Sequence, residues 1–356
     1  MNLIIQTCVP SYRLDFYKCL VEGNKAIQII SGDDYYTSSV KSDKTTPGVL
    51  WIKNIFILNR IFLFQMLPWA KVFKAENVII EFNLRNISFY LVFFIRFFLN
   101  KKTFLWGHAW SRKGRKSKSE LLRFLFKKLS NGYITYTQEQ KNELKTQLPN
   151  KAIYAACNAI YYKKQMWPLE VLDKNITDFI YVGRLVIEKK VFLLIKAFHN
   201  ILNELPEETK LFVAGTGNEH AKIKEYIEVN NLTKKVLLLG HISDYKQLKE
   251  LYSKAIASIS PGYVGLSLTQ SLGFGVPMII SRDERHSPEL EAANIKFNSV
   301  YFKTDDLNNL AATLKLIYLE RIQWLKKRNK ISEDCRNRYS IESMTEPFFE
   351  IFKLNE

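Results

Sequence analysis

The sequence has few of the residues from which disulfide frameworks and zinc sites are built. Its 356 residues include four cysteines, and Cys8, Cys19, Cys157 and Cys335 show no paired spacing. A zinc site or a disulfide-stapled domain needs such pairs, so we expect the reduced cysteines of a cytosolic protein. Hydrophobic residues make up 47% of the sequence. That share is enough to build buried cores, and it argues against a disordered chain.

Long hydrophobic runs are also absent. A helix needs about 20 apolar residues to cross a bilayer, and the most aromatic run, residues 87–99, is shorter than that. This run is expected to form either a buried helix or a helix partly inserted in a membrane interface. The first residues, 1–6, lack the basic, apolar and cleavage regions of a signal peptide. They predict a first strand instead.

Acidic residues are scarce in the first half of the chain. Of the 52 basic and 35 acidic residues, residues 1–165 hold 26 and 10, so this half carries a net charge of +16 out of +17. Between Lys101 and Lys128 there are ten basic residues and only one acidic residue, Glu120. A one-sided positive charge favours an anionic partner such as a membrane surface, a phosphorylated acceptor or a nucleic acid. The alternative is a basic surface that serves only solubility.

Strand and helix patterns alternate along the chain, which predicts parallel sheets in an α/β fold. Residues 50–58 are expected to form a strand, and 61–73 a helix. A polar stretch without a clear pattern, 161–177, is the expected linker. We therefore predict an N-terminal domain over 1–165 and a second domain over 166–340. A last helix over 341–356 is expected to return to the first domain.

The stretch from Ser260 to Ile280 has the order strand, glycine turn, short helix, glycine stop and strand. Such a turn directs backbone N–H groups and the positive end of a helix dipole at one point, which is typical of an anion site. On spacing alone, an ordinary βαβ crossover explains it equally well.

This stretch resembles the donor-binding segment of retaining glycosyltransferases of family 4, which have the GT-B fold. Gly265-Leu266 and the run Gly275-Val-Pro-Met278 match two motifs of that segment. The two glutamates of the family are replaced by Gly262 and Gln270, as in a bacterial polysaccharide-synthesis subgroup. The resemblance implies two Rossmann-like domains that face each other across a cleft. It covers 178–292 strongly and 1–165 weakly.

The resemblance also implies the donor-binding residues. The segment that follows Gly183 resembles a family motif in which Arg184 and Lys189 are the cations that hold the donor diphosphate. An arginine fork and a lysine suit phosphate oxygens, and they stabilise the charge on the leaving diphosphate without a metal. No Asp-x-Asp metal motif occurs in the sequence, so no metal and no cofactor are expected. The remaining donor-binding residues implied by the family are His241, Ile242, Gly265, Leu266, Ser267 and Gln270.

Candidates in the first half are fewer. The family places a histidine after the strand at 104–106, and here it would be the catalytic candidate His108. The Tyr12-Arg13 pair resembles one in the same subgroup. Together with Arg112, the pair is a candidate for binding an acceptor or a phosphate. A packed histidine and a surface arginine are the alternatives.

The sequence thus predicts a retaining hexosyltransferase that moves a sugar from a nucleotide-sugar to a saccharide or polyprenyl-linked acceptor. The expected setting is polysaccharide or O-antigen synthesis, with the chain bound peripherally to the inner face of the cytoplasmic membrane. Three alternatives remain: a nucleotide-sugar 2-epimerase, a degenerate transferase without both glutamates, and a non-catalytic nucleic-acid-binding protein. The basic cluster lacks a nucleic-acid motif, so no nucleic-acid partner is expected.

Overall fold

The computed structural model describes residues 1–37, 40–111, 114–169 and 176–353. Its contacts divide the chain into two compact units. Unit 1 comprises Met1–Ile160 and Ile341–Glu356, and unit 2 comprises Tyr161–Ser340. Each unit is described by itself below.

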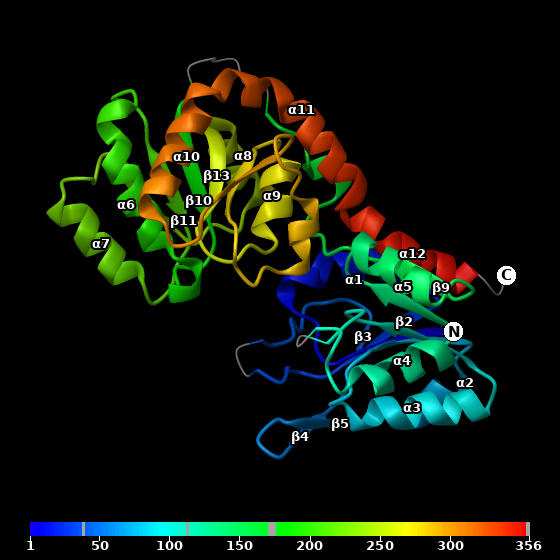
Figure 1. The fold of residues 1–356 in the computed structure, drawn as a ribbon. Helices are drawn as coiled ribbons and strands as arrows, with labels where there is room; N and C mark the ends of the chain where they lie inside the picture. The colour runs from blue at the N-terminus through cyan, green and yellow to red at the C-terminus, as the bar shows by residue number, and fades with distance from the viewer. Residues whose placement is uncertain (38–39, 112–113, 170–175, 354–356) are drawn as a thin grey trace. The chain divides into compact units, whose positions relative to one another are not determined.

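Unit 1 is built on a parallel sheet with the strand order β3-β2-β1-β6-β7-β8-β9 (Figure 1). Its central strands are almost continuous runs of buried residues, the pattern of a parallel sheet covered by helices on both faces. The strands are β1 (Asn2–Gln6), β2 (Ile27–Ser31), β3 (Val49–Trp51), β6 (Asn77–Glu81), β7 (Lys102–Trp106), β8 (Gly132–Thr135) and β9 (Ala152–Ala155).

The helices of unit 1 include one that comes from the end of the chain. The ring of Phe348 packs edge-on against Phe16 at 5.2 Å, so α12 joins α1 and contributes to the core of unit 1. The helices are α1 (Leu14–Gly23), α2 (Trp69–Lys74), α3 (Ile87–Phe98), α4 (Glu120–Leu129), α5 (Gln138–Gln147) and α12 (Ile341–Lys353).

The helix predicted over 61–73 is wrong for its first half. Residues 54–65 form an antiparallel hairpin of β4 (Asn54–Ile57) and β5 (Phe62–Gln65), and α2 begins only at Trp69. Leu58, Asn59 and Arg60 all have positive φ angles at the hairpin turn. A short apolar run can be read as a helix or as a strand in sequence, and here pairing with β4 decides the conformation.

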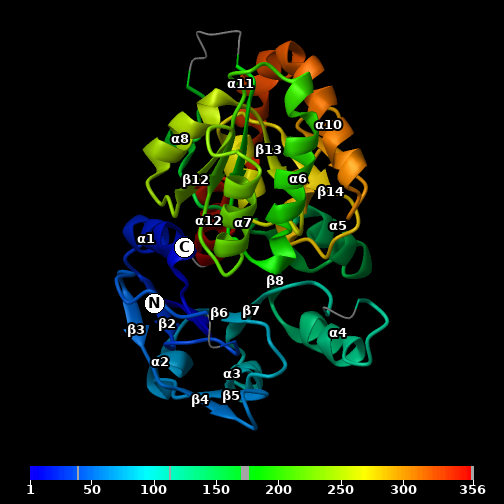
Figure 2. The same cartoon turned by 90° about the vertical axis from the view of Figure 1, so that its left-hand side faces the viewer.

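Unit 2 has a second parallel sheet, with the order β12-β11-β10-β13-β14-β15 (Figure 2). Its strands are β10 (Asp178–Val182), β11 (Leu211–Ala214), β12 (Val236–Gly240), β13 (Ala255–Ser260), β14 (Met278–Ser281) and β15 (Ser299–Phe302). Its helices are α6 (Val191–Ile201), α7 (His220–Val229), α8 (Tyr245–Lys254), α9 (Ser267–Gly273), α10 (Leu307–Leu319) and α11 (Arg321–Arg338).

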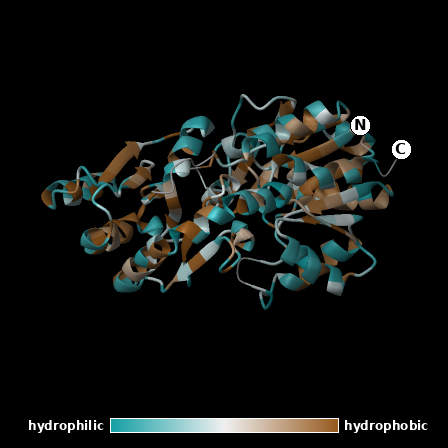
Figure 3. Ribbon diagram, turned by 90° about the horizontal axis from the view of Figure 1, so that it is seen from above, coloured by the Kyte–Doolittle hydropathy of each residue, from teal (hydrophilic) through white to brown (hydrophobic). Residues whose placement is uncertain are grey.

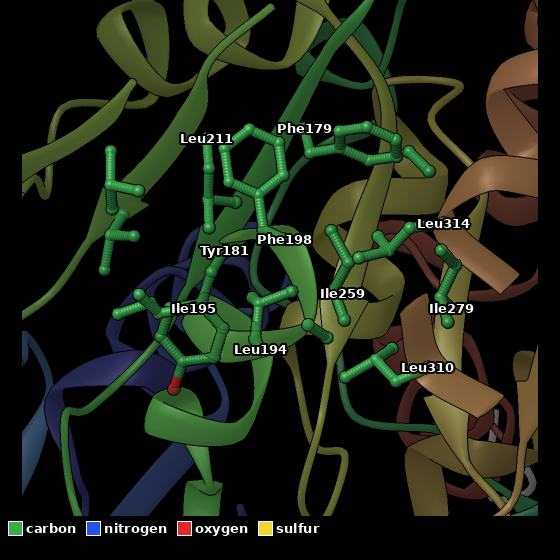
Figure 4. Close-up of a cluster of buried hydrophobic side chains, with 14 of the residues drawn as sticks. Phe179, Tyr181, Leu194, Ile195, Phe198, Leu211, Ile259, Ile279, Leu310 and Leu314 are labelled. Atoms are coloured by element: carbon green, nitrogen blue, oxygen red, sulfur yellow. The ribbon is translucent and has the colours of Figure 1, made fainter. Parts of the chain in front are cut away.

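The core of unit 2 lies between its sheet and the helices α6 and α10. Phe179 from β10, Phe198 from α6 and Leu314 from α10 are all fully buried in it (Figure 4). Many strand segments of both units are coloured as hydrophobic in Figure 3, whereas many helices show mixed colours. Each unit is therefore a Rossmann-like α/β unit, as the sequence predicted.

Candidate functional site

The strand order of unit 2 reverses between β10 and β13, its two central strands. In an open parallel sheet, ligands bind outside the carboxyl ends of the strands at such a switch point. The two segments that leave these ends are residues 183–190, after β10, and 261–266, after β13. The predicted diphosphate cations lie on the first segment, and the glycine turn lies on the second.

Backbone hydrogen bonds fix the loops at this edge of the sheet. The N–H of Gly183 donates to the carbonyl of Ala214 at 3.0 Å, and that of Leu185 donates to Thr216 at 2.8 Å. The loop after β10 is therefore held against the loop after β11, which gives Arg184 a defined backbone position.

Tyr263 brings the two predicted cations together. Arg184 Nη2 donates to the hydroxyl of Tyr263 at 2.8 Å, and Lys189 Nζ donates to its carbonyl oxygen at 2.8 Å. Lys189 Nζ also lies 3.6 Å from the centroid of the Tyr263 ring, within the range of a cation–π interaction. A single tyrosine at the switch point thus orders both cations.

Lys189 is a half-buried cation. Burial and, to a smaller extent, the positive charge of Arg184 lower its pKa to about 8, and the nearby Glu289 opposes this shift. Burial and the neighbouring cation both disfavour the charged form of Lys189. An anion bound between the two cations would stabilise both positive charges, so the site favours an anion. The arrangement is therefore electrostatically prepared for a phosphate group.

Gly262 is required by a close approach of backbone segments. A Cβ atom at this position would lie less than 3.0 Å from the carbonyl oxygen of Glu188, in the 3-10 turn that ends at Lys189. A glutamate therefore cannot replace Gly262 unless the turn moves. The glycine that stands here in place of the family's glutamate is therefore the residue that the local packing requires.

His286 holds the other side of the same loop. The N–H of Val264 donates to His286 Nδ1 at 3.0 Å, and His286 Nε2 lies 2.9 Å from the carbonyl oxygen of Ser281. These partners fix the neutral tautomer with its proton on Nε2, and burial lowers the pKa of the imidazole. The histidine thus ties the loop after β13 to the loop after β14.

Gln270 is buried on α9 and makes two side-chain hydrogen bonds. Its Nε2 donates to the hydroxyl of Tyr161 at 2.7 Å, and the hydroxyl of Tyr252 donates to its Oε1 at 3.3 Å. The amide thus belongs to a polar cluster inside unit 2, and its predicted contact with a donor ribose stays a prediction.

The other donor-site predictions lie on nearby loops of unit 2. Gly265, Leu266 and Ser267 lead into α9, and His241 and Ile242 follow β12. Lys190 adopts a positive φ of 52° and pairs with Glu284 and Asp305 at 2.6 Å each. Its side chain thus links the loop after β10 to the loops after β14 and β15, which is a structural role within unit 2.

The candidates of unit 1 lie on loops at the carboxyl edge of its own sheet. Tyr12 is exposed, whereas Arg13 is 7% exposed, and Arg13 Nη2 donates to Asn158 Oδ1 at 2.9 Å. The Arg13 guanidinium lies over the rings of Trp106 and Tyr136. Arg13 is therefore packed among these residues, and the alternative of a surface arginine is wrong.

The predicted catalytic histidine, His108, follows β7. Its carbonyl oxygen accepts hydrogen bonds from Arg123 and from the hydroxyl of Tyr133. Its ring lies 4.8 Å from that of Tyr136. Arg112, the third acceptor candidate, lies outside the described residues. Within the described residues, no group of three His, Cys, Asp or Glu side chains is arranged to hold a metal ion.

Comparison with known families shows a likeness of the second unit. Residues 168–338 match the family model described as glycosyl transferases group 1. Unit 2 is thus similar to the glycosyl transferases group 1 family over most of its length. This match supports the expected class of enzyme, a glycosyltransferase, and the activity of the chain itself stays a proposal. The assignment to family 4 and to O-antigen synthesis stays a prediction.

Two curated proteins are similar to the chain. One is a poly(ribitol-phosphate) alpha-N-acetylglucosaminyltransferase of Staphylococcus aureus, 22% identical over 62% of this chain and 44% of that protein. The other is an uncharacterised glycosyltransferase of Methanocaldococcus jannaschii, 27% identical over 69% of this chain and 64% of that protein. The chain thus spans about half to two thirds of the length of these relatives.

A solved structure extends the likeness to the whole chain. The HepE protein of Anabaena in complex with UDP has a TM-score of 0.68 at 13% identity, covering 99% of both chains. At this identity the likeness shows the fold alone. It confirms the GT-B fold class for the chain, with two Rossmann-like units.

The structure brings together Gly183, Arg184, Lys189 and the turn that ends at Gly265. The sequence reasoning missed Tyr263, which orders both cations, and His286, which ties down the turn. A signal for Tyr263 was present, because it lies between the two motif positions Gly262 and Gly265. His286 had no motif signal, since its role depends on a contact between two loops.

Proposed function

We propose that the chain is a retaining glycosyltransferase that transfers a sugar from a nucleoside diphosphate sugar to a saccharide or lipid-linked acceptor. The observation that carries this proposal is the meeting of Arg184 and Lys189 on Tyr263. It occurs at the switch point of a unit similar to the glycosyl transferases group 1 family. Two cations at this position suit a diphosphate.

The chemistry explains why cations are needed. When the glycosidic bond breaks, negative charge grows on the diphosphate that leaves, and fixed positive charges stabilise that state more than the ground state. Arg184 supplies a planar fork, and Lys189 supplies a point charge from a site with little water. No cofactor and no metal enter this proposal, and the nucleotide-sugar is a co-substrate.

The donor proposed first is a UDP-sugar. UDP is the nucleotide named with the Anabaena structure, and the S. aureus relative is named for the transfer of N-acetylglucosamine to a ribitol phosphate polymer. The first name supports a uridine nucleotide, and the second supports the transfer of a sugar to a polyol phosphate polymer. An acceptor in a cell-surface polymer is part of the proposal. A peripheral location at the membrane is part of the proposal.

The experiment incubates the purified chain with UDP-N-acetylglucosamine, UDP-glucose and the corresponding GDP- and TDP-sugars, with and without saccharide and polyol phosphate acceptors. Nucleotide release that depends on an acceptor is the expected result. The anomeric configuration of the product, read by NMR, tests retention. Conversion of the donor without an acceptor would instead favour an epimerase, and no reaction with any donor would contradict a transferase.

A further inference from the structure

Helix α3 of unit 1 carries apolar side chains on both sides, because Phe89, Val92 and Phe93 are buried in the core and other apolar residues are exposed. Its polar residues Ser88 and Arg96 are fully buried, whereas the exposed positions include Leu91, Phe94 and Phe98. Phe98 is 81% exposed. A helix on the surface of a globular protein normally has the opposite pattern, with its polar stripe toward water.

The buried polar residues fix this orientation. Ser88 Oγ accepts from the N–H of Gln65 at 2.8 Å and donates to its carbonyl at 3.1 Å. Arg96 donates to four backbone carbonyls, of residues 72, 75, 76 and 102, and to Thr103 Oγ1. Rotating α3 to hide its apolar side would break all of these bonds, so the exposure is built into the fold.

The exposed residues of α3 form one stripe. Ile87, Leu91, Phe94 and Phe98 follow each other at steps of four, three and four residues, so they lie on one face of the helix. No helix in the described part of the chain is long and apolar enough to cross a membrane. Any lipid contact of α3 therefore lies in the interfacial layer.

Helix α4 packs against α3 and has exposed apolar side chains of its own. Phe126 of α4 packs edge-on against Phe93 of α3 at 4.9 Å, and on the outer side of α4 Leu121 is 83% exposed and Leu125 48%. Figure 1 shows α3 and α4 on the same side of the sheet of unit 1. We call the exposed residues Ile87, Leu91, Phe94, Phe98, Leu121 and Leu125 the α3–α4 face.

The charges beside this face are positive. From Phe82 to Asn131 the only carboxylate is Glu120, and it lies 3.3 Å from Arg123 and 3.5 Å from Lys127. The exposed lysines 101, 116, 118 and 128 have no carboxylate partner among the described residues. A second copy of this chain would bring like charges together, whereas an anionic bilayer offers both hydrocarbon and negative charge.

We propose that the α3–α4 face docks on anionic lipid bilayers, with its apolar side chains in the interfacial layer and the lysines at the headgroups. The binding is mainly apolar, because several cations of the expected basic cluster are already engaged. Arg123 and Lys127 are buried, and Arg115 pairs with Glu143. Attachment therefore persists at high salt, where a purely electrostatic contact is screened.

The test uses the full chain and co-sedimentation with vesicles of phosphatidylcholine alone or mixed with phosphatidylglycerol, without any nucleotide or acceptor. The double variant Phe98→Ser/Leu121→Ser removes the two most exposed apolar side chains of the face. The matched control Val229→Ser/Leu319→Ser removes two side chains of unit 2 that are 74% and 63% exposed. Circular dichroism and thermal melting check that both variants fold.

The expected result is binding of the wild type and the control to the anionic vesicles, and at least a tenfold loss of partitioning for Phe98→Ser/Leu121→Ser at both low and high salt. Charge reversal in Lys116→Glu/Lys118→Glu should weaken binding only at low salt. A wild type that stays in the supernatant overturns the proposal, as does unchanged binding of the double variant. Self-association that is lost in the double variant, without vesicle binding, would assign the face to a second copy. The assay contains no donor, so its failure leaves the proposed transferase function untouched.

Discussion

Lys189 Nζ lies 3.6 Å from the centroid of the Tyr263 ring and donates a hydrogen bond to the carbonyl oxygen of the same residue. The side chain of one predicted phosphate ligand is thus held by a residue of the neighbouring loop. Because Arg184 contacts the hydroxyl of the same tyrosine, Tyr263 controls the positions of both cations. The following predictions depend on this arrangement.

Substitution of Tyr263 should separate its two roles. Tyr263→Phe removes the oxygen that Arg184 contacts and keeps the ring over Lys189, so donor affinity should fall by a factor of about ten, the cost of one hydrogen bond to a charged group. Tyr263→Ala also uncovers Lys189, and its effect on affinity should be larger. Isothermal titration with UDP compares the variants, and equal affinities for all three proteins would remove Tyr263 from the site.

The affinity for a nucleoside diphosphate should fall at alkaline pH. Burial lowers the pKa of Lys189 to about 8, so the free protein loses this charge as pH rises through that value. Binding of the anion then requires uptake of a proton, and affinity should fall by up to tenfold per pH unit above pH 8. Titrations between pH 6.5 and 9.5 measure this profile. In Lys189→Arg the fall should disappear, and a fall that persists would assign the titration to another group.

Gly262→Ala should displace the turn that carries Lys189, because the added Cβ meets the carbonyl of Glu188. We expect a lower melting temperature and at least a tenfold loss of donor affinity. Gly265→Ala is the matched control for stability, since its Cβ would have only ordinary contacts, the nearest at 3.6 Å. Equal melting temperatures of the two variants would show that the close approach at Gly262 is unimportant.

Gln270→Glu should not improve the enzyme. A carboxylate here would be buried between Tyr161 and Tyr252, and burial without a cation costs about 1–3 kcal/mol of folding free energy. Burial also raises the pKa of such a carboxyl group, so the loss of stability should grow as pH rises and be relieved at acidic pH. Thermal melting at pH 5 and pH 8 tests this sign. A large gain in donor affinity would instead mark Gln270 as a decayed glutamate.

The sequence predicted the features that depend on local pattern. The alternation of strands and helices predicted both parallel sheets. The family resemblance implied Arg184 and Lys189, which lie after β10 at the carboxyl edge of the second sheet, and their role in donor binding stays a prediction. The sequence reasoning failed where a distant contact decides the outcome. Residues 62–65 are a strand because β4 pairs with them.

The same limit applies to the candidate site. Arg13 looked like a surface residue because its partners Trp106, Tyr136 and Asn158 are far away in the sequence. Similarly, the ten basic residues between 101 and 128 suggested a strong positive patch, but the fold buries Arg123 and Lys127. The composition shows how many charged residues a segment has. Burial and ion pairing, which the composition does not show, decide which of these residues an outside partner can contact.

The most direct test of the account is the titration of UDP into the wild type, Arg184→Ala, Lys189→Ala and the control Lys234→Ala, an exposed lysine that precedes the amino end of β12. The account predicts that the wild type and Lys234→Ala bind equally. Each site variant should lose at least tenfold in affinity, since each lost hydrogen bond to a charged group costs about 1.5–3 kcal/mol. Unchanged affinity in both site variants, with a folded wild type that binds UDP, would contradict the assignment of Arg184 and Lys189 to the diphosphate.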